Sequence, residues 1–187
     1  MSGGPDGADG AGGSNGSRGS RGSGRQGVRG AITTVHRYSL PLPRHDVWTR
    51  ISDVSSYRAW WPWLRAFEAS ALAEGEEWRC EVQPPLPYPV RFRVAIERVD
   101  SAALVEARVL GDVVGDAMLT LEDAGGAGAR DGGGCVATLR SSLAPGNTAL
   151  QLVSRFAAPV ARYGHDWVLD SGARQFIARA VAPVAGD

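Results

Sequence analysis

The chain has 187 residues, 43% of them hydrophobic and 21% charged, and its 20 basic and 20 acidic side chains give a formal net charge of zero. This length and composition suit one soluble domain with one core, and the balanced charge predicts no nucleic-acid partner. No stretch approaches the roughly 18 apolar residues of a membrane span, and no apolar signal segment is found. The two cysteines have no metal-ligand spacing. They predict a reduced, cytoplasmic protein without a metal or other cofactor.

Residues 1–30 differ in composition from the rest. They contain 12 Gly, and Val28 is their only large aliphatic residue beyond the initiator Met. So little apolar surface cannot offset the entropy of ordering, which predicts a disordered leader rich in Gly, Ser and Arg. Its Arg-Gly-Ser pieces are of a kind found in RNA-binding tails, but it has no aromatic residue to stack on a base, which favours a solvated linker. The folded domain is expected over residues 31–183.

The domain is predicted to begin with a strand at residues 32–40, whose apolar positions are Ile32, Val35, Tyr38 and Leu40. A helix over residues 43–53 follows. Pro43 has the fixed φ that suits a helix start, and the apolar stripe behind it consists of Val47, Trp48 and Ile51.

Four aromatic residues fall within the seven positions Tyr57–Trp63. Ser55 is placed to cap a second, very short helix that holds them, and Pro62 to end it. Aromatic surface left in water costs about 25 cal/mol per Å², so these rings must meet a core or a ligand. We expect at least one of three indoles to line the mouth of a pocket, while the alternative is that they fasten the short helices to the sheet; the three are Trp60, Trp61 and Trp63.

Six further strands are predicted at residues 67–72, 76–82, 90–97, 104–110, 113–122 and 135–143. Alternation of apolar and polar residues in the last four is typical of an antiparallel sheet with one wet face. The charged positions favour a solvated outer face with cross-strand ion pairs. A charged side chain that pointed inward would anchor a carboxylate or carbonyl, and Arg79 is the first candidate because its strand has the least clear polarity.

The last predicted element is a long helix between residues 148 and 181, started or interrupted by Pro159. Its apolar positions recur every three or four residues, at Leu152, Phe156, Val160, Tyr163 and Trp167. The elements together predict an α+β fold, in which a curved seven-stranded antiparallel sheet wraps around the long C-terminal helix and two short helices follow the first strand. One helix cannot fill so wide a sheet, so an apolar cavity is expected between them.

Several pieces of sequence occur in an order that resembles the START-like, or SRPBCC, superfamily, in its polyketide cyclase/dehydrase and lipid-transport branch. They are Leu40–Trp48, Ile51–Asp53, Tyr57–Pro62, Gly111–Gly115 and Tyr163–Val168. The resemblance covers residues 31–182 and implies a helix-grip fold with a deep hydrophobic cavity. It implies no single activity, since members include carriers, cyclases, hydrolases and co-chaperones, so function must be argued from the site.

Two functions fit best. The first is the binding of a hydrophobic small molecule, lipid- or polyketide-like, which needs only the cavity. The second is a polyketide aromatase/cyclase, in which the cavity folds a poly-β-ketone and an inward Arg or Tyr polarises a carbonyl. A chaperone-like function would need an exposed apolar or single-sign patch, of which the balanced charge gives no hint.

Binding ranks first because no polar constellation is visible. His165 and Asp166 are consecutive on the predicted helix and are expected to point about 100° apart, so no dyad is expected between them. The sequence has no zinc-ligand spacing and no phosphate-binding loop. The residues expected to contact the ligand are Trp60, Trp61, Trp63, Arg79, Phe92, Val94, Leu119, Leu139, Phe156, Tyr163 and Trp167.

Overall fold

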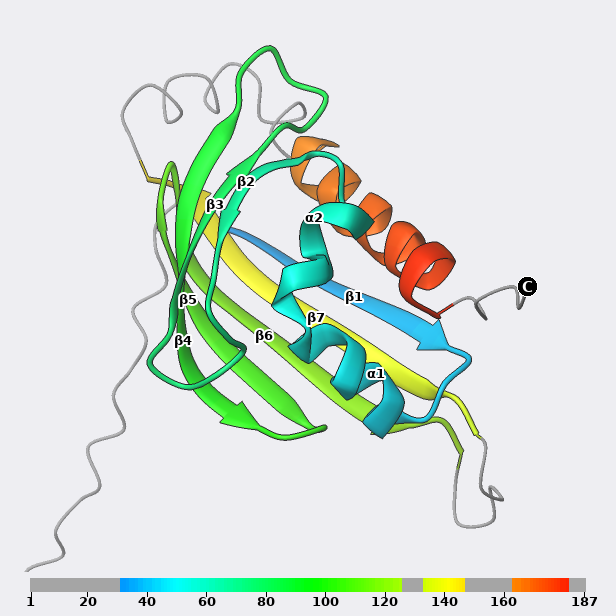
Figure 1. Ribbon diagram of the computed structural model, residues 1–187. Helices are drawn as coiled ribbons and strands as arrows, with labels where there is room; N and C mark the ends of the chain where they lie inside the picture. The colour runs from blue at the N-terminus through cyan, green and yellow to red at the C-terminus, as the bar shows by residue number, and fades with distance from the viewer. Residues whose placement is uncertain (1–30, 126–132, 147–162, 182–187) are drawn as a thin grey trace, which may run out of the picture.

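The computed structural model describes residues 31–125, 133–146 and 163–181, which form a curved sheet with helices on its concave side (Figure 1). The predicted leader at residues 1–30, Pro159 and the first part of the predicted C-terminal helix lie outside the described residues. The strands follow the order β1-β7-β6-β5-β4-β3-β2, and each neighbouring pair is antiparallel. Their bounds are β1 Ile32–Leu40, β2 Leu64–Glu68, β3 Glu77–Val82, β4 Val90–Asp100, β5 Leu104–Gly111, β6 Val113–Asp123 and β7 Cys135–Pro145.

Helices cover the concave face of this sheet. Helix α1 spans Arg44–Ser52, a 3-10 turn η1 spans Val54–Ser56, and α2 spans Tyr57–Trp60. The C-terminal helix is described from residue 163 and ends in a π-helical turn, η2, at Ile177–Val181. The predicted helix-grip architecture is therefore confirmed. Pro43 stands directly before α1, where its ring-fixed φ of −55° leads the chain into the helix.

The predicted cap of the second short helix is wrong. The hydroxyls of Ser55 and Ser56 instead donate hydrogen bonds to the two carboxylate oxygens of Asp53, each 2.5 Å long. A charged carboxylate is a stronger acceptor than a neutral group, so both hydroxyls turn back towards it. These bonds lower the pKa of Asp53 and hold the turn between α1 and α2.

The second strand begins earlier than predicted, at Leu64 instead of Phe67. Its pairing with β3 fixes this position, since Leu64 lies opposite Val82 and Phe67 opposite Cys80. The apolar residues that suggested a longer strand, Ala69 and Leu72, pack against the core around Tyr57 from the following loop. These two apolar residues are therefore explained by burial in the core and not by membership of a paired strand.

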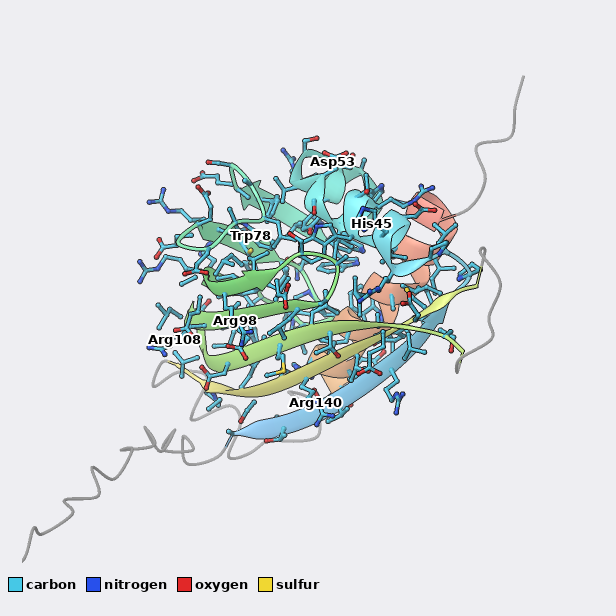
Figure 2. All side chains as sticks on the ribbon, turned by 90° about the horizontal axis from the view of Figure 1, so that it is seen from below. His45, Asp53, Trp78, Arg98, Arg108 and Arg140 are labelled. Atoms are coloured by element: carbon cyan, nitrogen blue, oxygen red, sulfur yellow. The ribbon has the colours of Figure 1, made fainter. Side chains whose placement is uncertain are left out.

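The outer face of the sheet carries the charged side chains, as predicted. Figure 2 shows Arg108 and Arg140 directed away from the helices. The ion pairs there are Arg91–Glu81 at 2.7 Å, Arg108–Glu97 at 2.8 Å, Arg79–Glu68 at 3.3 Å and Arg93–Glu77 at 3.3 Å. Each of these arginines is exposed, so a single pair contributes little to the free energy of unfolding.

The inner face is apolar and forms three clusters of buried side chains, centred on Val47, Tyr57 and Ile96. Between strands β6 and β7 the backbones come very close at Gly115, where φ is +148°. A side chain there would collide with the carbonyl oxygen of Ser142, so only glycine fits. The clusters do not fill the concave side completely, and the remaining space is the candidate site.

Candidate functional site

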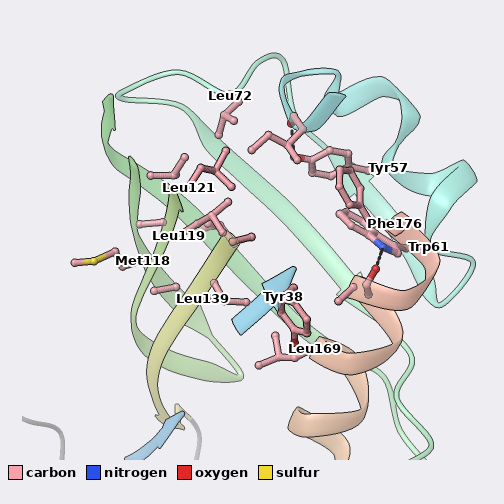
Figure 3. Close-up of a pocket in the computed structure, with 18 of the residues that line it drawn as sticks. Tyr38, Tyr57, Trp61, Leu72, Met118, Leu119, Leu121, Leu139, Leu169 and Phe176 are labelled. Carbon is pink, nitrogen blue, oxygen red and sulfur yellow. Dashed lines mark hydrogen bonds between the residues drawn. The ribbon is translucent and has the colours of Figure 1, made fainter. Parts of the chain in front are cut away.

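A cavity of about 370 Å³ lies between the concave face of the sheet, the segment of short helices and the C-terminal helix (Figure 3). This volume falls within the range of small-molecule pockets. The described residues that line it include none with a charged side chain. They are Tyr38, Leu40, Val47, Ile51, Tyr57, Trp61, Trp63, Leu72, Trp78, Val94, Ile96, Val105, Ala107, Ala117, Met118, Leu119, Leu121, Ala137, Leu139, Val168, Leu169, Gly172, Ala173 and Phe176.

The helical part of this wall comes from one stripe of the C-terminal helix. Val168, Leu169, Gly172, Ala173 and Phe176 share a face of the helix, because each lies three or four residues from another member of the set. Two members of the stripe are small, so the helix backbone forms part of the wall and space remains for a ligand.

Four aromatic side chains of the wall have their polar tips occupied by other parts of the protein. Each tip donates a hydrogen bond to a neighbouring oxygen, and therefore only carbon surface is left for a ligand. The bonds are Tyr57 Oη to Ile51 O at 2.6 Å, Trp78 Nε1 to Ala71 O at 2.8 Å, Trp61 Nε1 to Gly172 O at 2.9 Å and Trp63 Nε1 to Gln175 Oε1 at 3.0 Å.

The aromatic segment Tyr57–Trp63 is clamped to the C-terminal helix. Besides the bonds of Trp61 and Trp63, the guanidinium of Arg179 donates to the carbonyls of Ala59 and Trp60 at 2.8 and 3.0 Å. The ring of Trp60 lies edge-on to Phe176 with centroids 5.4 Å apart. Trp61 and Trp63 line the cavity, and the same two rings fasten the aromatic segment to the C-terminal helix. The two roles considered for the indoles are therefore compatible.

Tyr38 differs from the other aromatic residues of the wall. It lies on β1, and its hydroxyl is buried and makes no hydrogen bond of ordinary geometry within the described residues. Burial first, and the carboxylate of Asp170 second, raise the pKa of this phenol to about 12. Tyr38 is therefore neutral at physiological pH and holds a proton that it can donate.

A cluster of polar side chains lies beside Tyr38, between the C-terminal helix and strands β1 and β7. His36 Nδ1 is 3.6 Å from Asp170 Oδ1, and His36 Nε2 is 3.9 Å from Asp166 Oδ1. His165 Nε2 lies 3.3 Å from Ser141 Oγ. Burial lowers the pKa of His165, although Asp166 acts in the opposite direction.

The prediction that His165 and Asp166 do not contact each other on this helix is wrong. His165 Nδ1 and Asp166 Oδ1 are 3.4 Å apart, since the approximately 100° between consecutive Cα–Cβ directions on a helix does not prevent the ends of two longer side chains from meeting. Neither residue lines the cavity, nor does Ser141. The contacts join the helix to β1 and β7, and only Tyr38 continues from this region into the cavity wall.

Five of the residues expected to contact a ligand come together on the cavity wall. They are Trp61, Trp63, Val94, Leu119 and Leu139. The strand members among them follow from the period of two, which puts alternate side chains on the concave face.

Other expected residues lie elsewhere. Arg79 sits on the outer face paired with Glu68, because the alternation of β3 is regular after all and turns Trp78 inward. Tyr163 is 58% exposed, since it lies outside the stripe that begins at Val168.

Three aromatic residues pack beside the cavity without lining it, and one expectation is untested. Trp60 contacts Phe176, Trp167 lies edge-on to Trp63 with centroids 6.4 Å apart, and Phe92 packs in the cluster around Tyr57. Phe156 lies outside the described residues.

Several wall residues are not among those expected from the sequence, above all Tyr38 and Phe176. Strict alternation along β1 would have found the first, because Leu40 is buried and Tyr38 and His36 must share its face. The expected apolar positions mixed both faces of this strand, and Val35 is in fact 52% exposed.

Among the residues described, no group of His, Cys, Asp and Glu side chains is arranged to hold a metal ion. Nor is any described helix long and apolar enough to cross a membrane.

No protein-family model matches this sequence, and no curated protein matches it either. Solved structures do resemble the fold. A START superfamily protein from Mycobacterium smegmatis aligns with a TM-score of 0.60 at 12% identity, over 80% of this chain and 97% of its own. The Zhui aromatase/cyclase from a Streptomyces species aligns with a TM-score of 0.61 at 14% identity, over 84% of this chain and 99% of its own. Norcoclaurine synthase from Thalictrum flavum aligns with a TM-score of 0.52 at 14% identity, over 80% of this chain and 98% of its own. At such identities the likeness shows the fold alone, which is START-like (SRPBCC-like).

Proposed function

We propose that this START-like domain binds a hydrophobic small molecule, lipid- or polyketide-like, in the cavity under the C-terminal helix. The observation that supports the proposal most is the cavity of about 370 Å³, because the part of its wall that the structure describes contains no charged residue. An apolar pocket of this size takes up apolar molecules that match its shape, because water at its wall finds few hydrogen-bond partners. Burial of the ligand's apolar surface supplies the affinity.

The test is uptake of hydrophobic probes by the purified protein, measured by native mass spectrometry and by quenching of tryptophan fluorescence. Leu119 lines the cavity and Thr120, the next residue of β6, does not. We expect Leu119→Trp to fill the space and weaken uptake at least about tenfold, whereas Thr120→Trp on the opposite face leaves it unchanged. Equal uptake by both variants, or no uptake by the parent protein, would refute the binding function.

A polyketide aromatase/cyclase is a second candidate, and Tyr38 is the observation that favours it. Cyclisation of a poly-β-ketone needs a folded substrate and a proton donor near one carbonyl. The cavity would supply the folding, which can be worth about 7–11 kcal/mol of the barrier. The neutral Tyr38 phenol would polarise the carbonyl after its hydroxyl, which is buried in this structure, turned towards the substrate. Arg79, whose guanidinium the sequence offers for this role, is exposed on the outer face.

The enzyme function is tested with a model poly-β-ketone. We expect the protein to accelerate cyclisation and to narrow the range of products, and Tyr38→Phe to remove most of the acceleration while uptake continues. The same rate and products with and without protein would exclude the cyclase and leave the binding function intact.

A further inference from the structure

Strand β1 forms one margin of the sheet (Figure 2). It pairs with β7 on one side, and no segment of the described residues pairs with its other side. An edge of this kind presents a row of backbone N–H and C=O groups to which another strand can be added. β1 presents it over nine residues, Ile32–Leu40.

The register of the sheet shows which residues of β1 face this edge. Two hydrogen bonds at the ends of the β6–β7 pair, Ala124 N to Gly134 O at 2.8 Å and Gly146 N to Asp112 O at 2.7 Å, mark the even-numbered residues of β7 as those bonded to β6. Bonding alternates along a strand, so odd-numbered residues of β7 bond to even-numbered residues of β1. The residues that direct their backbone groups to the free edge are therefore Thr33, Val35, Arg37 and Ser39.

The two edge strands differ in their protection against further pairing. The other edge strand, β2, has only five residues, Leu64–Glu68, of which two are charged, and its register shifts just after Leu64. Short length, irregular pairing and charge are features that keep edge strands from pairing. β1 pairs with β7 without a shift, contains no proline, and has Arg37 as its only Arg, Asp or Glu residue.

A second copy of the chain is complementary to this edge. If two β1 strands pair antiparallel about a two-fold axis at Val35, the two Val35 side chains meet, and this side chain is exposed in the single chain. Arg37 of each copy then lies opposite Thr33 of the other, so no like charges meet. On the inner face Ile32 lies opposite Tyr38, which is a favourable aliphatic–aromatic pair. An axis at Arg37 would instead put two guanidinium groups opposite each other.

We propose that β1 is a dimerisation edge, to which a second copy of this chain adds antiparallel about a two-fold axis at Val35, so that the two sheets become continuous. The same surface serves both copies, as in other two-fold dimers. Residues 31–39 would supply about ten backbone hydrogen bonds, and the two Val35 side chains an apolar contact at the axis. The proposal is independent of the proposed ligand, because Val35 does not line the cavity.

The test follows the molecular mass of the full chain by sedimentation velocity over a series of protein concentrations. The variants are Val35→Glu, Val35→Lys and Thr33→Glu. Val35→Glu brings two carboxylates together at the axis, whereas Thr33→Glu puts each new carboxylate opposite Arg37 of the other copy. These two variants make the same change in net charge on one face of one strand, so each is the control for the other. Circular dichroism checks that all variants are folded.

The parent protein should form dimers as its concentration rises. Val35→Glu and Val35→Lys should each weaken association at least about tenfold when alone, because like charges meet at the axis, and an equimolar mixture of the two should associate again. Thr33→Glu should strengthen association about threefold through two new cross-strand ion pairs.

A parent protein that remained monomeric at about 100 μM would overturn the proposal. So would a dimer that Val35→Glu leaves unchanged, or one that Val35→Glu and Thr33→Glu weaken alike, since either result would place the contact elsewhere. If one variant did not fold, the order of the other two relative to the parent would still decide between these outcomes.

Discussion

The indole of Trp61 donates a 2.9 Å hydrogen bond to the backbone carbonyl of Gly172, 111 positions away on the C-terminal helix (Figure 3). Both residues line the cavity. The bond therefore joins two walls of the candidate site, and the aromatic segment both encloses the cavity and holds the helix in place. A ligand that enters between the aromatic segment and the helix must break this hydrogen bond, or it must enter elsewhere.

Trp61→Phe should destabilise the protein more than Trp60→Phe does. Both substitutions shorten an indole to a phenyl ring, but only Trp61 loses a hydrogen bond to the helix. Losing this hydrogen bond to the Gly172 carbonyl, which also accepts a backbone bond within the helix, should cost about 1 kcal/mol beyond the shared loss of ring surface. Urea unfolding followed by circular dichroism measures the difference, and equal midpoints for the two variants would mean that the bond contributes nothing.

Asp53→Asn should lower stability at neutral pH and have less effect in acid. The hydrogen bonds from Ser55 and Ser56 lower the pKa of this carboxyl below its ordinary value. The stabilisation is therefore complete above the unfolded-state pKa and is lost as the pH falls through the folded-state pKa. Melting temperatures between pH 7 and pH 3 should show the two proteins converging. Asp100→Asn is the control, since its carboxylate has no partner among the described residues, and a constant gap for Asp53→Asn would contradict the assignment.

Both cysteines should resist thiol reagents in the native protein. Burial raises the pKa of the Cys80 thiol to about 12, and burial together with Asp123 raises that of Cys135. Only the thiolate reacts, so labelling at pH 8 should be at least about a hundredfold slower than for a free thiol. Colorimetric titration should find two thiols in urea and almost none without it. Rapid reaction of one thiol in the folded protein would show that the surrounding packing opens readily.

Arg79→Gln should leave ligand uptake unchanged. The guanidinium points away from the cavity and is 69% exposed beside Glu68. Stability should change by less than about 1 kcal/mol, as is usual for an exposed ion pair. Parallel uptake and unfolding measurements check both statements, with Leu119→Trp as the variant that does lose uptake. A clear loss of ligand in Arg79→Gln would restore Arg79 as an anchor.

The architecture could be predicted because the patterns that encode it are local. Alternation along β4 puts Val94 and Ile96 on one face and Arg91 and Arg93 on the other, and any antiparallel partner must respect that division. The boundary of β2 could not be found in this way, since burial of Leu72 in a loop leaves the same apolar signal as burial in a strand.

Sequence alone determined the order of the elements, the two faces of the sheet and the presence of an unfilled apolar space, because each depends on periodicity and size. Tertiary structure decided which side chains meet that space. Tyr163, Trp167 and Phe176 are all aromatic and lie on one helix, yet only Phe176 lines the cavity. The rotation of a helix about its axis is set by its packing against the sheet and the short helices, and one residue of offset turns a side chain by about 100°. The same packing buries the hydroxyl of Tyr38 beside the carboxylate of Asp170, and no pattern in the sequence predicts this.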